Sequence, residues 1–195
     1  MTNRRTYHHG DLRQAVLTAA LDVIATEGPG ALSLRDLARR AGVSHAAPAH
    51  HFKDRTGLLT AIAAQGYDLL AEALAGAADL RERGVRYVRF AAAHPAHFQV
   101  MFQPDLYRER ADDAELLAAR ARASAELRSG AATLAADPAV ARDTGIAAWS
   151  LAHGFATLLL THNLDDPLGG RDPGETFRAL TGLLGSAQLT DTARE

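Results

Sequence analysis

The chain has 195 residues and a formal net charge of −2, with 47% of its residues hydrophobic and 23% charged. This length accommodates one or two small domains, and the lack of cysteine excludes disulfide bonds and thiolate metal sites. No apolar run approaches the roughly 18 residues of a membrane span, and the N-terminus lacks the apolar segment of a signal peptide. We therefore expect a cytoplasmic protein without a membrane partner.

The two parts of the chain differ in charge. Residues 1–55 carry eight Lys/Arg and five Asp/Glu, a balance of +3, together with five of the nine histidines. Residues 56–195 carry thirteen Lys/Arg and eighteen Asp/Glu, a balance of −5. A mildly basic segment ahead of an acidic remainder is typical of a compact nucleic-acid-binding domain joined to a domain with another role. We predict two domains, over residues 1–55 and 56–195.

The first predicted element is a helix whose apolar residues recur at helical spacing: Leu12, Val16, Ala19, Val23 and Ile24. Gly28-Pro29-Gly30 ends it sharply, because glycine and proline cannot continue the helical pattern. No stretch of the chain shows the two-residue alternation of a strand.

Two short helices follow, joined by a glycine turn. Ser33 and Asp36 resemble a capping box at the start of the first, and Gly42 suits the left-handed residue that ends it. Ser44 is a natural N-cap for the second, which Pro48 restricts to about two turns. A glycine turn between two short helices is typical of the helix-turn-helix motif, whose second helix lies in the DNA major groove.

The rest of the chain is also predicted to be helical. Asp54 can cap a fourth helix over about 55–78, whereas residues 165–170 are expected to be a loop. Further helices are expected over about 80–94, 96–102, 111–136, 138–163 and 174–187. The predicted fold is all-α: an N-terminal three-helix helix-turn-helix domain, then a C-terminal helical ligand-binding and dimerisation bundle, with about nine helices in all.

The second helix of the motif and its surroundings offer two kinds of DNA contact. Candidates for base edges are its outward positions, Ser44, His45, Ala46, Ala49 and His50. Candidates for phosphate are the donors around this helix, Ser33, Arg35, His51, Lys53 and Arg55. Arg4 and Arg5 form a short arm that can enter a neighbouring minor groove.

Residues 11–63 resemble the N-terminal domain of TetR-family transcriptional regulators. The matching positions are Gly28, Leu34, Ala38, Gly42-Val43-Ser44, His51-Phe52 and Arg55 before Leu58-Leu59. The resemblance implies that His51 and Arg55 bind phosphate and that residues 45–50 face the groove. The chain departs from the family at Pro48-Ala49, where a Leu-Tyr pair is common and the tyrosine often touches phosphate. Either Lys53 or His50 replaces that contact, or operator affinity is lower; Ala49 can instead meet a thymine methyl group.

Near the C-terminus, Trp149 and His153 share one helix face, and Gly154 permits close approach of another helix. This is similar to a TetR subgroup named for its Trp, His and Gly. Such domains imply an apolar cavity for a small effector. Our pocket candidates are Tyr87, Phe90, Phe98, Met101, Phe102, Trp149, His153 and Phe155; the alternative for each is an ordinary core position.

Half-site DNA readers of this size need two-fold symmetry to span two major grooves, and the resemblance also implies a homodimer. The most apolar C-terminal helices offer the pairing surface, with Leu151, Leu158, Leu159, Phe177, Leu180, Leu183 and Leu184 as candidates.

Three other function classes fit the sequence less well. The histidines lack a His-Glu-x-x-His helix, and adjacent histidines on a helix point about 100° apart, which argues against a metal site. There is no phosphate-binding loop or nucleophile elbow, and a pairing of His153 with Ser150 or Thr157 arises by chance in any helical bundle. A pure protein-interaction module would have no reason for the basic segment.

We therefore expect a non-enzymatic repressor without cofactor or metal. It would bind palindromic double-stranded DNA as a homodimer and be released by a small apolar or amphipathic molecule. The alternative is a non-catalytic helical protein that binds a small molecule or metal without operator binding.

Overall fold

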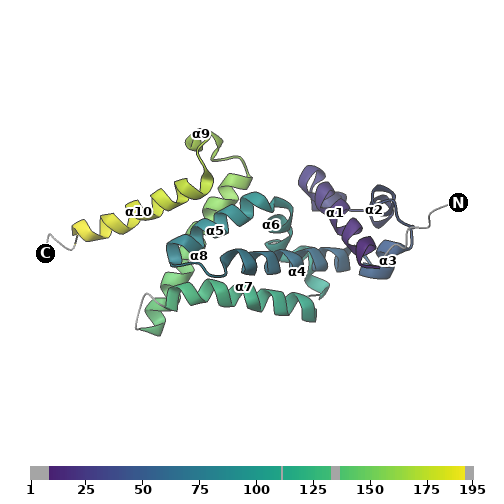
Figure 1. Cartoon of the computed structure of the whole chain (residues 1–195), viewed down its shortest axis with the longest axis horizontal. Coiled ribbons are helices and arrows are strands. Elements are labelled where there is room, and N and C mark those ends of the chain that lie inside the picture. Colours follow the sequence, from purple (N-terminus) through teal and green to yellow (C-terminus); the bar gives the residue numbers. More distant parts are fainter. Residues whose placement is uncertain (1–8, 111, 133–136, 192–195) are drawn as a thin grey trace. The chain divides into compact units, whose positions relative to one another are not determined.

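The computed structural model describes residues 9–110, 112–132 and 137–191 (Figure 1). Within these ranges the chain forms α-helices and short 3-10 helices and no strand, which confirms the all-α prediction. The α-helices are α1 His9–Glu27, α2 Leu34–Arg40, α3 Ala47–Phe52, α4 Arg55–Leu74, α5 Leu80–Ala93, α6 Pro95–Met101, α7 Ala114–Ala132, α8 Pro138–Leu160, α9 Asp165–Leu168 and α10 Pro173–Asp191. The two 3-10 helices are η1 Pro29–Ala31 and η2 Pro104–Arg110.

The boundaries differ from the prediction mainly at helix ends. The fourth helix ends at Leu74 rather than near residue 78. The short helix α9 forms within the segment expected to be a loop, so the described ranges hold ten α-helices instead of about nine. Gly169, in the left-handed conformation with φ 55°, ends α9. None of the helices in the described ranges is long and apolar enough to cross a bilayer.

The described residues separate into two compact units. The first contains the chain up to Gly66 together with Pro95–Ala118, and the second contains Tyr67–His94 and the chain from Ala119. Helices α4 and α7 therefore each contribute to both units. The predicted functional boundary between residues 55 and 56 concerns roles rather than packing, and it stays a prediction.

The core of the first unit is built by one face of α1 against α2, α3 and the start of α4. Fully buried side chains on these elements are Val16, Leu17, Ala20, Leu37, Ala38, Leu58, Leu59 and Ile62. Gly28 ends α1 with φ 80°, a backbone conformation that residues with a Cβ rarely adopt. This core packs α1, α2 and α3 against one another.

The predicted capping box at the start of α2 is wrong. Ser33 is the N-cap, but its hydroxyl makes no capping hydrogen bond. Arg40 Nε donates to Asp36 Oδ2 at 2.6 Å, and Arg39 Nη2 donates to Asp36 Oδ1. Both hydrogen bonds lower the pKa of Asp36, and the bond from Arg39 has the larger effect. The arginines three and four residues on therefore hold the carboxylate away from the Ser33 backbone.

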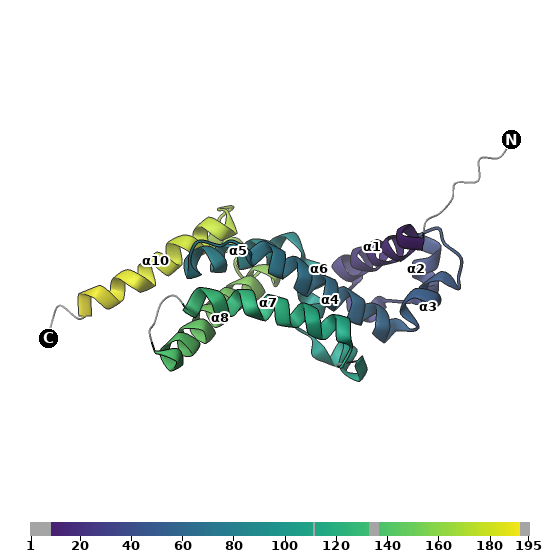
Figure 2. The same cartoon turned by 60° about the horizontal axis from the view of Figure 1, so that its bottom comes forward.

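The second unit is organised around α5, which packs against both α8 and α10 (Figure 2). Val85, Val88 and Ala91 are fully buried on α5, and Phe155 of α8 meets Phe177 of α10 edge to face with ring centroids 5.4 Å apart. A Cβ at Gly84 would lie 2.6 Å from Cε1 of Phe177, so the absence of a side chain at position 84 lets α10 approach α5.

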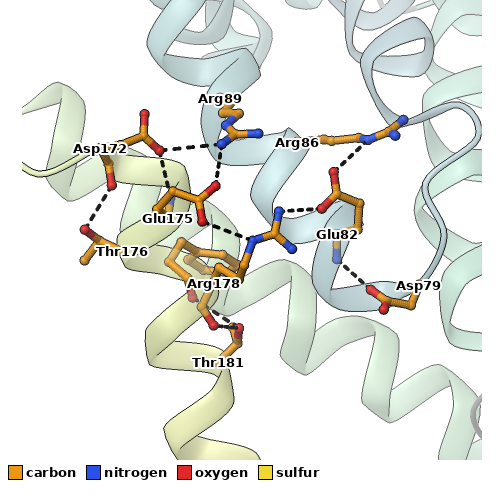
Figure 3. Close-up of polar contacts among 10 residues, drawn as sticks. Asp79, Glu82, Arg86, Arg89, Asp172, Glu175, Thr176, Arg178 and Thr181 are labelled. Atoms are coloured by element: carbon orange, nitrogen blue, oxygen red, sulfur yellow. Dashed lines mark hydrogen bonds and ion pairs between the residues drawn. The ribbon is translucent and has the colours of Figure 1, made fainter.

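A network of ion pairs also holds the first half of α10 against α5 (Figure 3). Arg178 Nη2 donates to Glu82 Oε2 at 2.6 Å, and Arg89 Nη2 donates to Glu175 Oε1 at 2.7 Å. Asp172 Oδ1 accepts from the Glu175 backbone N–H at 2.8 Å and so caps α10. The two arginines come from different helices, so the network fixes the register of α10 on α5.

Candidate DNA-binding surface and ligand pocket

The second helix of the helix-turn-helix motif is α3, and it starts later than the sequence suggested. Its N-cap is Ala46, and the carbonyl of Ser44 accepts from Ala47 N–H at 3.0 Å in a turn that precedes the helix. The prediction of Ser44 as N-cap is therefore wrong. Pro48 falls in the first turn, where backbone N–H groups have no acceptor inside the helix, so proline removes nothing there. The six-residue helix confirms that this element is short.

Helix α3 is anchored by one face and open on the other. Ala47, Pro48 and Phe52 are buried, and the Arg13 guanidinium of α1 lies 5.5 Å from the centre of the Phe52 ring. The predicted base-contacting side chains all lie on the exposed side: Ser44, His45, Ala46, Ala49 and His50. The glycine turn that sets this orientation has Gly42 at φ 65°, as predicted.

The predicted phosphate-binding residues differ in exposure. Ser33, Arg35 and Lys53 are exposed, whereas His51 and Arg55 are half-buried. Arg55 Nη2 donates to the Pro29 carbonyl at 2.7 Å, which ties the start of α4 to the turn after α1. A guanidinium has five N–H donors, so this bond leaves others for phosphate. An open hollow beside α2 and its turn is lined by Ser33, Arg35, Asp36, Ala38, Arg39, Gly42, Val43 and His45.

The junction between α3 and α4 is tightly built. Lys53 has φ 68° and ψ −59°, and the Asp54 N–H donates to the Phe52 carbonyl at 2.8 Å. These dihedrals and this hydrogen bond define a γ-turn of the rare, strained kind with a positive φ. Asp54 Oδ1 accepts from Gly57 N–H at 2.7 Å, which confirms Asp54 as the cap of α4. A Cβ at Gly57 would overlap the carbonyl oxygen of Phe52.

Arg110, at the end of η2, completes this junction. Its Nη2 donates to Asp54 Oδ2 at 2.8 Å across 56 positions of sequence. The hydrogen bond from the Gly57 N–H lowers the pKa of Asp54 most, and the bond from Arg110 lowers it further. The pKa therefore lies below its ordinary value, and the carboxylate is ionised at neutral pH. The turn that follows α3 is thereby connected to the end of η2 within the first unit.

In the second unit, Tyr87 of α5 meets Trp149 and His153 of α8. The Tyr87 hydroxyl lies 2.9 Å from His153 Nδ1, and the Trp149 and His153 rings lie 5.7 Å apart, which confirms that these two share a helix face. Burial raises the pKa of Tyr87, and a hydrogen bond with Trp149 partly opposes this. Burial also lowers the pKa of His153, which keeps the imidazole neutral at pH 7. Among the described residues, no atom of another element lies within 4 Å of a Cβ built at Gly154, so the described part of the chain does not make the close helix approach that this glycine permits.

Beside this cluster lies a hollow of about 30 Å³ between α5, α7 and α8. Tyr87 and Trp149 line it, together with Leu80, Arg83, Leu127 and Ala152. Phe90 and Phe155 are buried elsewhere in this unit. The other three pocket candidates belong to the first unit, where Phe98 and Met101 are buried and Phe102 is half-buried.

The candidate pairing residues divide by exposure. Leu151, Leu158, Leu180 and Leu183 expose 40%, 46%, 41% and 66% of their surfaces. Leu159 is half-buried, and Phe177, at 2% exposure, is buried within the chain itself. Phe177 therefore positions α10 and adds no exposed apolar surface. The side chain of Leu184, like residues Arg4 and Arg5, lies outside what the structure describes.

Two family models match the sequence. Residues 16–62 match the model described as bacterial regulatory proteins of the tetR family, and residues 80–184 match the tetracyclin repressor-like C-terminal domain. The second match alone spans more than half of the chain. The chain belongs to the TetR family. It is a DNA-binding transcriptional regulator with an N-terminal helix-turn-helix domain and a C-terminal helical domain.

Solved structures agree with this assignment. A protein with unknown function from Rhodococcus sp. RHA1 is 32% identical with a TM-score of 0.73, and the match covers 92% of this chain and 96% of that one. The "putative regulatory protein SCO4313" is 26% identical with a TM-score of 0.75, over 94% and 100% of the two chains. PfmR, a TetR-family transcriptional regulator from Thermus thermophilus, has the same fold at 24% identity and a TM-score of 0.58, over 86% and 95%. A comparison with curated protein sequences found no match.

Sequence reasoning missed three residues that shape the sites of this TetR-family regulator. Gly57 and Arg110 hold the α3–α4 junction, and Arg83 lines the hollow in the second unit. The only available signal for Gly57 was a glycine one turn into a predicted helix, where it is normally unfavourable. Arg83 lies among charged residues of α5 and gave no signal, because its burial depends on helices distant in sequence, among them α7, whose Glu126 it contacts.

Proposed function

We propose that this regulator is a ligand-responsive repressor that binds a palindromic operator as a homodimer. A small apolar or amphipathic effector binds the second unit and releases the DNA. The observation that carries DNA recognition is the two-sided character of α3. Its inner side chains, Ala47, Pro48 and Phe52, are buried in the first unit, while its outer side chains are free to enter a major groove.

Specificity in this proposal comes from the outer face of α3. His45 and His50 supply ring nitrogens for base edges, and Ala49 presents a methyl group to a thymine methyl. Arg35 of α2 and Lys53, directly after α3, are exposed and bind phosphate, which supplies register and most of the affinity. Arg55 and His51 take the same role from half-buried positions, and Arg4 and Arg5 add a minor-groove arm.

Dimerisation is assigned to α8 and α10. Their exposed leucines give each protomer an apolar face that a single chain leaves in water. The ion pairs between α5 and α10 keep this face in one orientation, which a two-fold interface requires because the same patch must meet itself.

Release by an effector requires a difference in effector affinity between the DNA-fitting conformation and another one, typically about 1–3 kcal/mol. The hollow beside Tyr87 and Trp149 is the starting point of the effector site in this proposal. Membership of the Trp-His-Gly subgroup is part of the same proposal. It is supported by the contacts that Trp149 and His153 make with Tyr87.

The DNA-binding part is tested by selecting bound duplexes from a random pool and measuring affinity for the selected site over a salt series. Wild type should recover a palindrome. Replacing Arg35 by Ala should weaken binding and reduce the slope of log K against log salt by about 0.9, the value for one lost phosphate contact. Arg81→Ala, which removes the same charge from an exposed position in the second unit, is the matched control. An unchanged slope for Arg35→Ala, or selected sites without two-fold symmetry, contradicts the proposal.

A further inference from the structure

The outer face of α3 offers hydrogen-bond donors and methyl groups but no side-chain carboxylate or amide. Ala46, Ala49 and His50 follow one another at helical spacing, so they share one face, and all three are exposed. The His50 backbone N–H donates to the Ala46 carbonyl at 2.9 Å, which fixes this spacing. His45 is exposed in the turn directly before α3. The segment 44–53 contains no Asp, Glu, Asn or Gln.

The surroundings of this face are basic. His45 lines the open hollow beside α2 together with Arg35 and Arg39. Asp36 belongs to the same hollow, but its carboxylate already accepts from two arginines of α2. The carboxylate of Asp54, after α3, likewise accepts from an arginine of η2. The positive charges around α3 therefore favour base edges that are rich in acceptors.

The four bases differ in what they present to such a face in the major groove. Guanine presents two acceptors, N7 and O6, whereas adenine places an amino donor beside its N7 and cytosine presents an amino donor. Asn and Gln suit adenine, and Asp and Glu suit cytosine, so the segment 44–53 lacks the side chains that best read these two bases. An imidazole has at least one N–H donor in either protonation state, and guanine N7 takes no part in Watson–Crick pairing. The methyl group of thymine is matched by alanine.

We propose that His45 and His50 each donate to N7 of a guanine, and that Ala46 and Ala49 contact thymine methyl groups. This inference rests on the proposed function, since it takes α3 to lie in the major groove of an operator. It deepens that function by naming the bases: each half-site is read through guanine and thymine. His45 and His50 are then the residues that determine specificity for guanine.

The test changes single groups of the palindrome that wild type selects from a random pool. 7-Deazaguanine replaces N7 by a C–H group, and deoxyuridine lacks only the methyl group of thymidine; both keep Watson–Crick pairing. Each guanine and each thymine is replaced in turn, in both half-sites together, and the affinity of the full-length protein is measured at constant salt. Two guanines per half-site should each weaken binding about fivefold or more when replaced. At least one thymine should weaken it about threefold or more.

Variants assign each base to a side chain. His45→Ala and His50→Ala should each abolish the effect of 7-deazaguanine at one position and keep it at the other. Ala49→Gly should abolish the effect of deoxyuridine at one position; the ratio of affinities for modified and unmodified duplexes cancels any general loss caused by the glycine. Arg35→Ala is the contrasting control. It should weaken binding to both kinds of duplex by the same factor, because a phosphate contact carries no sequence information.

The outcomes separate this inference from the proposed function. If the selected palindrome tolerates 7-deazaguanine at every position, or is weakened by 7-deazaadenine instead, guanine reading is overturned while operator binding stands. Wild-type ratios in both histidine variants also overturn it. If a histidine variant no longer binds the palindrome, the pattern of modified bases on wild type decides. If wild type enriches no palindrome, the proposed function fails, and this inference fails with it.

Discussion

Replacing Gly57 by Ala tests whether the α3–α4 junction sets the position of the recognition helix. The added Cβ would overlap the Phe52 carbonyl oxygen, which is backbone and cannot move by changing a rotamer. Overpacking of this kind costs about 1–3 kcal/mol, against a gain of up to about 1 kcal/mol from the higher helix propensity of alanine. We expect the free energy of unfolding of the first unit to fall by about 1–2 kcal/mol.

Part of this strain can be relieved by displacing α3, and the native position must then be restored when DNA binds. A restoring cost of about 1.4 kcal/mol appears as a tenfold weaker operator affinity. Urea unfolding followed by far-ultraviolet circular dichroism measures the stability, and Trp149 fluorescence follows the second unit separately. Gly30→Ala is the matched control, because none of the described atoms beyond its chain neighbours lies within 4 Å of its Cβ position. If Gly57→Ala keeps wild-type stability and operator affinity, the junction does not position α3 as argued.

Three further changes have defined outcomes. Lys53→Gly should stabilise the first unit by about 0.5–1 kcal/mol by relieving the positive φ, while reducing the salt slope of operator binding by about 0.9; an unchanged slope would show that Lys53 makes no phosphate contact. Asp54→Ala should lose about 1 kcal/mol of capping stability at pH 7. Because folding lowers the pKa of Asp54, the stability that its charge contributes is present above the unfolded pKa near 4 and is lost as the pH falls below that value. The difference in stability from wild type, measured by urea unfolding, should therefore shrink at pH 3. His153 has a lowered pKa when folded, so the stability of the second unit should be full above about pH 6.5 and decrease on acidification below it; His153→Gln should remove that decrease, and a wild-type stability flat between pH 7.5 and 5 would contradict the assignment.

Much of the DNA-binding part was predictable because its signals are local. The helical spacing of apolar residues in α1, the left-handed glycine at position 42 and the Asp54 cap each depend on residues within one or two turns. The exposure of His45 and His50 followed from the same short-range pattern. Ser33 and Ser44 show where this reasoning fails. Both are good caps by type, but arginines compete for Asp36 and a turn precedes α3, so neither side chain caps its helix as predicted.

The helices, their order and the helix-turn-helix motif were thus determined by the sequence itself, since backbone propensity and apolar periodicity act between near neighbours. Only the tertiary structure decided which side chains meet. Arg110 reaches Asp54 across 56 positions, Tyr87 reaches His153 across 66, and Arg83 reaches Glu126 across 43. Burial and partnership depend on how distant helices pack, and an isolated stretch of sequence holds no record of that packing. The residues that shape the proposed sites therefore became visible only when the helices were assembled.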